Sequence, residues 1–155
     1  MRLRCLSFTA TVLLAWRLFG AEQPLPYSHK THVALGLKCN GCHTMPGDGE
    51  MATFPPESLC MSCHSSIKKD SPHIQKLAEF AKDKKPVPWV RVYQLPGYVW
   101  FSHKGHMKRG ACETCHGPVA ERDVLTREKP ITMAACMACH DETKALNECN
   151  TCHNP

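Results

Sequence analysis

The sequence predicts a mostly irregular fold with short α-helices, little or no β-sheet, and a core built around bound groups rather than its own side chains. Three features of the composition predict this fold. Only 7% of the 155 residues are aromatic, which leaves little bulk for an ordinary apolar core. The chain carries 11 cysteines and 10 histidines, an unusual share for this length. Its 12 prolines limit the length of any helix or central strand.

The first 21 residues have the pattern of a signal peptide. Arg2 and Arg4 form a basic start, and an uncharged, mostly apolar stretch follows over residues 6–16. Arg17 ends this stretch, so it is shorter than the roughly 20 residues that span a bilayer. We therefore expect cleavage after Ala21, a periplasmic or otherwise exported protein, and no firm membrane anchor.

Every cysteine after the leader belongs to a C-x-x-C-H motif, the attachment signature of c-type haem. The five motifs are Cys39-Asn40-Gly41-Cys42-His43, Cys60-Met61-Ser62-Cys63-His64, Cys112-Glu113-Thr114-Cys115-His116, Cys136-Met137-Ala138-Cys139-His140 and Cys149-Asn150-Thr151-Cys152-His153. Two thiols one helical turn apart reach the two vinyl groups of one porphyrin, and the adjacent imidazole is aimed at the iron. A thioredoxin-like pair or a zinc site also uses C-x-x-C, but neither requires the histidine. The sequence therefore predicts five covalently attached haem c groups.

The histidines outside these motifs match the number of motifs. Five histidines follow a second cysteine and are predicted to be proximal iron ligands, which leaves five others as candidate distal ligands: His29, His32, His73, His103 and His106. Methionine is the competing distal ligand and raises the reduction potential. The methionines near the motifs are Met45, Met51, Met61, Met107, Met133 and Met137, and we interpret them as packing against porphyrin.

The mature chain divides into two modules and a connector. Residues 22–70 form a predicted two-haem module, and residues 98–155 form a predicted three-haem module. Each begins with an H-x-x-H element, in which two imidazoles share a helical face but can point at different irons. Residues 71–97 predict a helix that starts at Ser71-Pro72 and then a proline-rich, extended connector. Each C-x-x-C-H motif is expected on a short helix.

The formal charge of +5 does not indicate a protein that binds nucleic acid. Three arginines leave with the leader, and each ferric haem with ionised propionates and two imidazole ligands adds about −1. Five such groups would make the mature protein negative. We expect redox proteins as partners and no nucleic acid.

The C-terminal module resembles a known family. The residues that carry the likeness are Phe101-Ser102-His103-Lys104-Gly105-His106, then Cys112-Glu113-Thr114-Cys115-His116-Gly117, then the two closely spaced final motifs. They resemble the class III multihaem cytochromes c, small periplasmic tri- and tetrahaem carriers, over residues 98–153. The resemblance implies a multihaem cytochrome c fold with haem at its core.

The resemblance also implies which histidines share an iron. In that family the first histidine of F-x-H-x-x-H serves the next haem and the second serves a later one, which pairs His103 with His116 and His106 with His140. Trihaem relatives supply the last haem from between their first two motifs, but residues 119–135 here contain no histidine. His73 becomes the candidate for the haem of His153. By the same order His29 would pair with His43, and His32 with His64.

A narrower likeness lies in the connector. Pro86-Val87-Pro88-Trp89-Val90-Arg91-Val92, Leu95-Pro96 and residues 98–101 look like the segment before a haem motif in pentahaem subunits of alternative complex III and menaquinone reductase complexes. That likeness implies a peripheral haem subunit on a quinol-linked membrane complex, with Trp89, Tyr93 and Trp100 at the docking surface. The simpler interpretation is that these side chains cover haem faces.

The sequence as a whole favours an electron carrier over an enzyme. If every iron has two imidazole ligands, no haem offers a site to a substrate, and outer-sphere electron transfer is the chemistry that remains. The alternative is a multihaem oxidoreductase with one open haem. The nitrite reductases of that kind resemble this chain less, because they carry a C-x-x-C-K motif and all five motifs here end in histidine.

Overall fold

We describe residues 22–45, 47 and 51–153 of a computed structural model of the protein. The predicted signal peptide, residues 1–21, lies outside this part of the chain and stays a prediction. The described residues contain short helices and no β-strand, which confirms the predicted fold class. None of the helices among them is long and apolar enough to cross a membrane.

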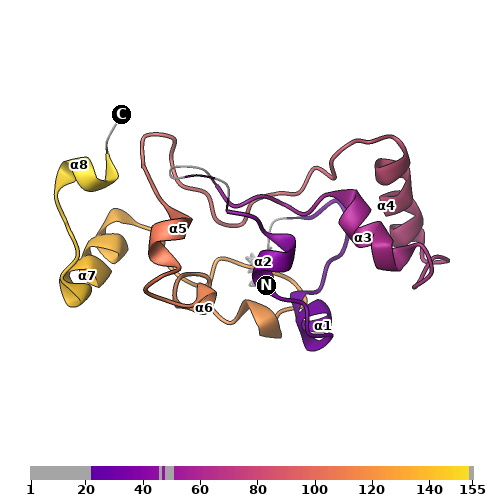
Figure 1. The fold of residues 1–155 in the computed structure, drawn as a ribbon, viewed down its shortest axis with the longest axis horizontal. Coiled ribbons are helices and arrows are strands. Elements are labelled where there is room, and N and C mark those ends of the chain that lie inside the picture. Colours follow the sequence, from indigo (N-terminus) through magenta and orange to yellow (C-terminus); the bar gives the residue numbers. More distant parts are fainter. Residues whose placement is uncertain (1–21, 46, 48–50, 154–155) are drawn as a thin grey trace, which may run out of the picture.

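The elements form an elongated arrangement in which α4 and α8 lie at opposite ends (Figure 1). In chain order the helices are α1 (His29–Ala34), α2 (Cys39–Cys42), α3 (Glu57–His64), α4 (Pro72–Lys82), α5 (His103–His106), α6 (Cys112–His116), the 3₁₀ turn η1 (Val119–Glu121), α7 (Met133–Thr143) and α8 (Cys149–Cys152). All five C-x-x-C-H motifs therefore lie on helices or at helix ends, as expected. The segment between α6 and α7 contains one short turn, η1, where Glu121 N–H donates to the Pro118 carbonyl at 3.0 Å.

The apolar core is small and lies at one end. Leu25, Leu77 and Val87 are the buried hydrophobic residues among those described. Leu77 projects from α4, which begins at Ser71 with Pro72 in its first turn, as the sequence predicted. This core holds α4 against α3, whose Cys60 packs beside it. Among residues 98–153 no hydrophobic side chain is buried, so apolar packing contributes little to the stability of this part of the chain.

Two groups of hydrogen bonds tie distant segments together. Ser28 Oγ donates to Asp123 Oδ1 at 2.6 Å, and Lys30 N–H donates to the Arg122 carbonyl at 3.0 Å, which fastens α1 to the end of η1. At the C-terminal end, Trp100 N–H donates to the Cys152 carbonyl at 2.7 Å and fastens the connector to α8.

Candidate functional site

The two H-x-x-H elements adopt the same local structure. Ser28 and Ser102 are the N-cap residues of α1 and α5, and each hydroxyl accepts a hydrogen bond from the backbone N–H three residues later, at 3.0 and 3.1 Å. The serine carbonyls accept from the second histidine of each element: His32 Nδ1 donates to Ser28 O at 2.8 Å, and His106 Nδ1 to Ser102 O at 2.7 Å. A proton on Nδ1 leaves Nε2 free to bind metal.

The aromatic residue before each serine holds both histidine rings. Tyr27 stacks on His32 with ring centroids 4.4 Å apart, and Phe101 stacks on His106 at 4.3 Å. The same two rings meet the first histidines, His29 and His103, edge to face at 4.8 Å. The repeated sequence pattern is therefore a repeated structural unit that aims its two imidazoles in different directions.

The motif histidines are oriented in a similar way by backbone carbonyls. His43 Nδ1 donates to Thr53 O at 2.8 Å, His64 Nδ1 to Ile67 O at 3.0 Å, and His140 Nδ1 to Leu146 O at 2.6 Å. A carbonyl can only accept, so the proton lies on Nδ1 and the lone pair on Nε2. Such partners fix the ring orientation and raise the basicity of a metal-binding imidazole.

Eight of the ten histidines form four pairs across the fold. The pairs are His29–His43 at 6.3 Å between ring centroids, His32–His64 at 6.2 Å, His103–His116 at 6.4 Å and His106–His140 at 6.0 Å. Two imidazoles on opposite sides of one metal ion have ring centres about 6 Å apart, because each metal–nitrogen bond is roughly 2 Å and each nitrogen lies roughly 1 Å from its ring centre. These residues therefore fit a haem iron between each pair.

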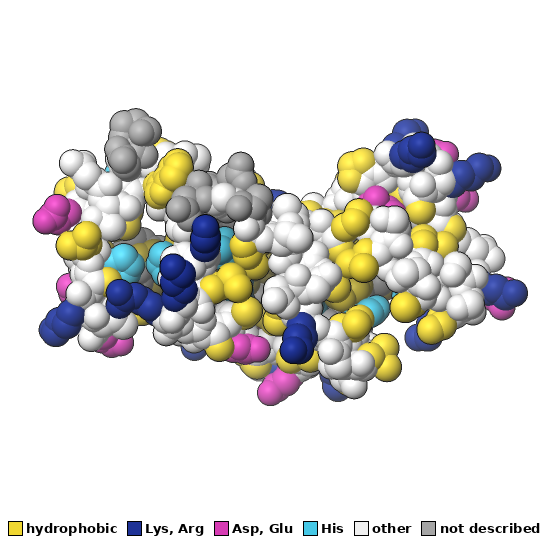
Figure 2. All heavy atoms as spheres, in the orientation of Figure 1, with side chains coloured by type: hydrophobic (Ala, Val, Ile, Leu, Met, Phe, Trp, Pro, Cys, Tyr) yellow, Lys and Arg dark blue, Asp and Glu magenta, His cyan; other side chains and the backbone are white. Residues whose placement is uncertain are grey.

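The electrostatics favour a neutral imidazole at two of the paired histidines, His29 and His116. Burial, followed by the nearby His43 and His32 rings, lowers the pKa of His29 to about 4. Burial, followed by His103 and His43, also lowers the pKa of His116. A neutral ring is the form that donates a lone pair to iron. Histidine side chains lie in recesses between surface residues on both halves of the molecule (Figure 2).

The five motifs form a row whose order differs from their order in the chain. Burial raises the pKa of Cys60, and the nearby Cys42 thiol adds to the shift, so the second motif lies beside the first. Burial and then the neighbouring Cys39 thiol raise the pKa of Cys112. The first motif therefore lies between the second and the third.

The row continues to the C-terminal end. Burial and then Cys139 raise the pKa of Cys115, which places the third motif beside the fourth. Burial and then Cys152 raise the pKa of Cys136, which places the fourth beside the fifth. Helices α3, α2 and α6 follow one another in the same order along the molecule, and α7 and α8 lie together at the end opposite α4 (Figure 1). In the haem-bound protein these sulfurs would be thioethers, and the contacts then report which haems are neighbours.

Two histidines remain outside the pairs. His73 is exposed in the first turn of α4, and His153 lies at the C-cap of α8. The structure does not bring them together, because the apolar face of α4 packs on α3 at the end of the molecule opposite α8 (Figure 1). The ring next to His153 is that of Tyr98, at 6.0 Å.

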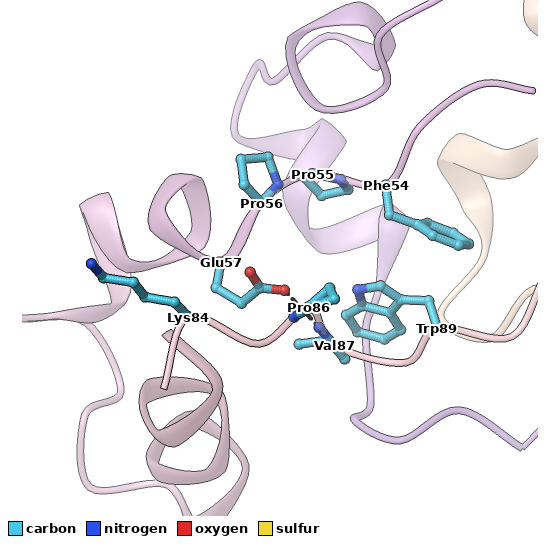
Figure 3. A pocket seen from close by; sticks show the side chains of 8 residues that line it. All are labelled: Phe54, Pro55, Pro56, Glu57, Lys84, Pro86, Val87 and Trp89. Atoms are coloured by element: carbon cyan, nitrogen blue, oxygen red, sulfur yellow. Dashed lines mark hydrogen bonds between the residues drawn. The ribbon is translucent and has the colours of Figure 1, made fainter. Parts of the chain in front are cut away.

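A cavity of about 310 Å³ opens beside α3 (Figure 3). Its aromatic walls are Phe54 and Trp89, and its one carboxylate, Glu57, accepts a hydrogen bond from Val87 N–H at 2.6 Å. Three prolines and Val87 supply further apolar walls, and Lys84 also lines the cavity. This agrees with the simpler interpretation of Trp89 as a side chain that covers a haem face.

Sequence reasoning missed the residues that hold the proximal side of the motifs. The Tyr93 ring packs edge-on against His116 at 4.7 Å, and its hydroxyl donates to the His116 carbonyl at 3.3 Å. The carbonyls of Thr53, Ile67 and Leu146 could not be found from sequence, since any residue type supplies one. For the H-x-x-H elements a signal was available, because an aromatic residue, Tyr27 or Phe101, stands two positions before the first histidine of each element.

Comparisons with known proteins agree with this site. Residues 99–154 match the family described as cytochrome c7 and related cytochrome c. The chain is 30% identical over 161 residues to the menaquinone reductase multihaem cytochrome c subunit of Nitratidesulfovibrio vulgaris strain Hildenborough, covering 85% of this chain and 77% of that protein. It is 30% identical over 57 residues to cytochrome c3 of Desulfuromonas acetoxidans, covering 37% of this chain and 82% of that protein. The chain therefore belongs to the multihaem c-type cytochromes, proteins of electron transfer that carry covalently bound haem c.

Proposed function

We propose that this chain is a pentahaem electron carrier of the periplasm, or of another exported compartment, that passes electrons between redox partners. The observation that carries the proposal is the row of five motifs, four of which have their histidine facing a second histidine at 6.0 to 6.4 Å. Bound haem would supply a one-electron couple between ferric and ferrous iron.

The chain's own contribution is to fix the positions and orientations of the imidazole rings that would bind the haem irons. The paired imidazoles would hold each iron in either oxidation state, so little structural reorganisation would accompany transfer. The carbonyl partners of Nδ1 keep each ring in place. Each H-x-x-H helix holds rings that face two different motifs, which sets the spacing of adjacent haems.

The count of haems and their ligation are tested together. A pyridine haemochrome assay and the intact mass of the purified protein should give five haems per chain. A low-temperature electron paramagnetic resonance spectrum of the oxidised protein should show low-spin iron for the four haems with paired histidines. Fewer than five haems, or high-spin iron at several of them, would contradict the proposal.

The export proposal has its own test. The leader pattern and the ten motif cysteines, which need thioether formation, support export and cleavage after Ala21. The N-terminal peptide of the mature protein should begin at Glu22, and the haem should fractionate with periplasmic contents. An uncleaved Met1 recovered with membranes would instead indicate an anchor.

A more specific role is supported by the named relative. The relative from Nitratidesulfovibrio is a menaquinone reductase subunit, which favours a haem subunit of a quinol-linked membrane complex for this chain. We expect the full-length chain to copurify with other subunits from detergent-solubilised membranes and to be reduced there by a menaquinol analogue. The purified chain alone is the control, and equal reduction of both samples would argue against the role.

A further inference from the structure

The described residues include all ten histidines, and the fifth motif is the one without a histidine facing it. His153 Nδ1 lies 3.4 Å from the Tyr98 carbonyl, on the side of the ring away from Nε2. Nε2 is therefore the nitrogen left for iron, as at the other motifs. Tyr98 supports the proximal side of this site through its backbone.

The remaining histidine does not complete this site. His73 lies on α4, and α4 is held against α3 by the buried side chain of Leu77. The fifth motif is the last in the row, on α8 at the far end (Figure 1). Bringing His73 to it would require α4 to leave the one apolar core that the described residues form.

The surroundings of the fifth motif are open. Tyr98 is 72% exposed, Trp100 50% and Leu146 70%, although all three belong to segments bonded to α7 or α8. The four paired motifs lie inside the row or beside the core at α3. The fifth lies where a molecule from solution can approach it.

We propose that the haem at Cys149–His153 keeps its sixth iron position free of this chain's side chains and binds an external nitrogen donor of the imidazole type there. The donor is either a free small molecule or a histidine of another polypeptide, including His73 of a second copy. The inference rests on the proposed pentahaem function, and it makes the end of the row a ligand-binding site.

The test uses the purified five-haem protein in its ferric state at low concentration. We expect one high-spin haem per chain in the electron paramagnetic resonance spectrum. Added imidazole should convert it to low-spin in one saturable step, with the other four unchanged. His32→Ala is the positive control, because removing a paired ligand should create a second imidazole-sensitive haem at His64.

Spectra of the wild-type protein at several concentrations, and of His73→Ala, identify the source of the donor and can overturn the proposal. A high-spin signal that grows on dilution of the wild-type protein, and is constant in His73→Ala, would assign the donor to a second copy. Five low-spin haems at every concentration and no response to imidazole would overturn the proposal. Under that result, a new high-spin haem in His73→Ala would assign the ligand to this chain's His73. A haem count below five would instead count against the proposed function.

Discussion

The hydroxyl of Tyr93 joins the backbone of His116 to the backbone of Glu128 and Lys129. It accepts hydrogen bonds from the N–H groups of Glu128 and Lys129, at 3.0 and 3.1 Å, and donates to the carbonyl of His116. The loop after α6 is thereby held against the third motif. Tyr93 thus helps to stabilise residues 98–153, which bury no hydrophobic side chain.

Tyr93→Phe should lower the free energy of unfolding of the haem-bound protein by about 1 to 2 kcal/mol, because two amides and one carbonyl lose their partner. Guanidinium unfolding followed at the haem Soret band measures the change. Tyr98→Phe is the matched control, since the Tyr98 side chain is 72% exposed and its hydroxyl has no hydrogen bond to the described residues. An equal loss of unfolding free energy in both variants would refute the stabilising role of the Tyr93 hydroxyl.

Gly117 ends α6 in a backbone conformation that suits glycine. Its φ is 73° and its ψ is −174°, a region that side-chain-bearing residues rarely enter. A Cβ there would also lie 3.2 Å from Glu128, whose carboxylate pairs with Arg122. At Gly117, next to His116, both the backbone conformation and the closeness of the Glu128 side chain therefore favour glycine.

Gly117→Ala should destabilise the protein by about 1 to 3 kcal/mol through backbone strain. Thermal unfolding of the haem-bound protein checks the loss. Gly97→Ala should change stability little, because a Cβ at that position meets nothing within 4 Å. An equal loss of stability in both variants would show that backbone strain at Gly117 is not the cause.

Among the elements, α4 is held mainly by apolar packing. Leu77 is 6% exposed and forms the core with Leu25 and Val87. The other α-helices carry the predicted haem-binding residues and contain no buried residue. Within the described residues, the region around α4 and α3 is therefore stabilised by an apolar core, and residues 98–153 are not.

Leu77→Ala should cost about 2 to 5 kcal/mol locally, by lost burial and a cavity. Hydrogen exchange should accelerate over residues 72–82 and stay unchanged over α5 and α6. Leu146→Ala, at a position 70% exposed, is the control. Faster exchange throughout the chain would show that the two parts unfold together.

Local signals explain which elements could be predicted. Pro72 and the apolar spacing of α4 mark that helix, and the C-x-x-C-H motifs mark the others, because these features act within one or two turns. The order of the motifs in space could not be predicted, since it depends on contacts such as Lys30 with Arg122. His73 was expected to serve the fifth haem, and no sequence signal showed that the Leu77 face would keep α4 at the other end.

At the scale of the whole molecule, the first motif lies between the second and third motifs and so connects the two predicted modules. Cys39 lies against Cys112 of the third motif, and Cys42 lies near Cys60 of the second. The connector between the modules takes a longer route through α4. A path for electrons through the row therefore differs from the path of the chain.

Removing the first haem with Cys39→Ala and Cys42→Ala should isolate the second haem from the other three. After a pulse that delivers less than one electron per chain, redistribution should show two kinetic phases in place of one. The Cys149→Ala and Cys152→Ala variant loses the last haem and should keep a single phase. A single phase in both variants would mean that the second haem has another neighbour.

The close contact of successive motifs also bears on how the protein would hold charge. An electron on one iron raises the electrostatic cost of placing another on its neighbour, because like charges repel strongly at short range. Reduction of five adjacent haems would then spread over a wide span of applied potential rather than occur at one value. A row built in this way would store several electrons per chain, taken up and released in one-electron steps over that span of potential.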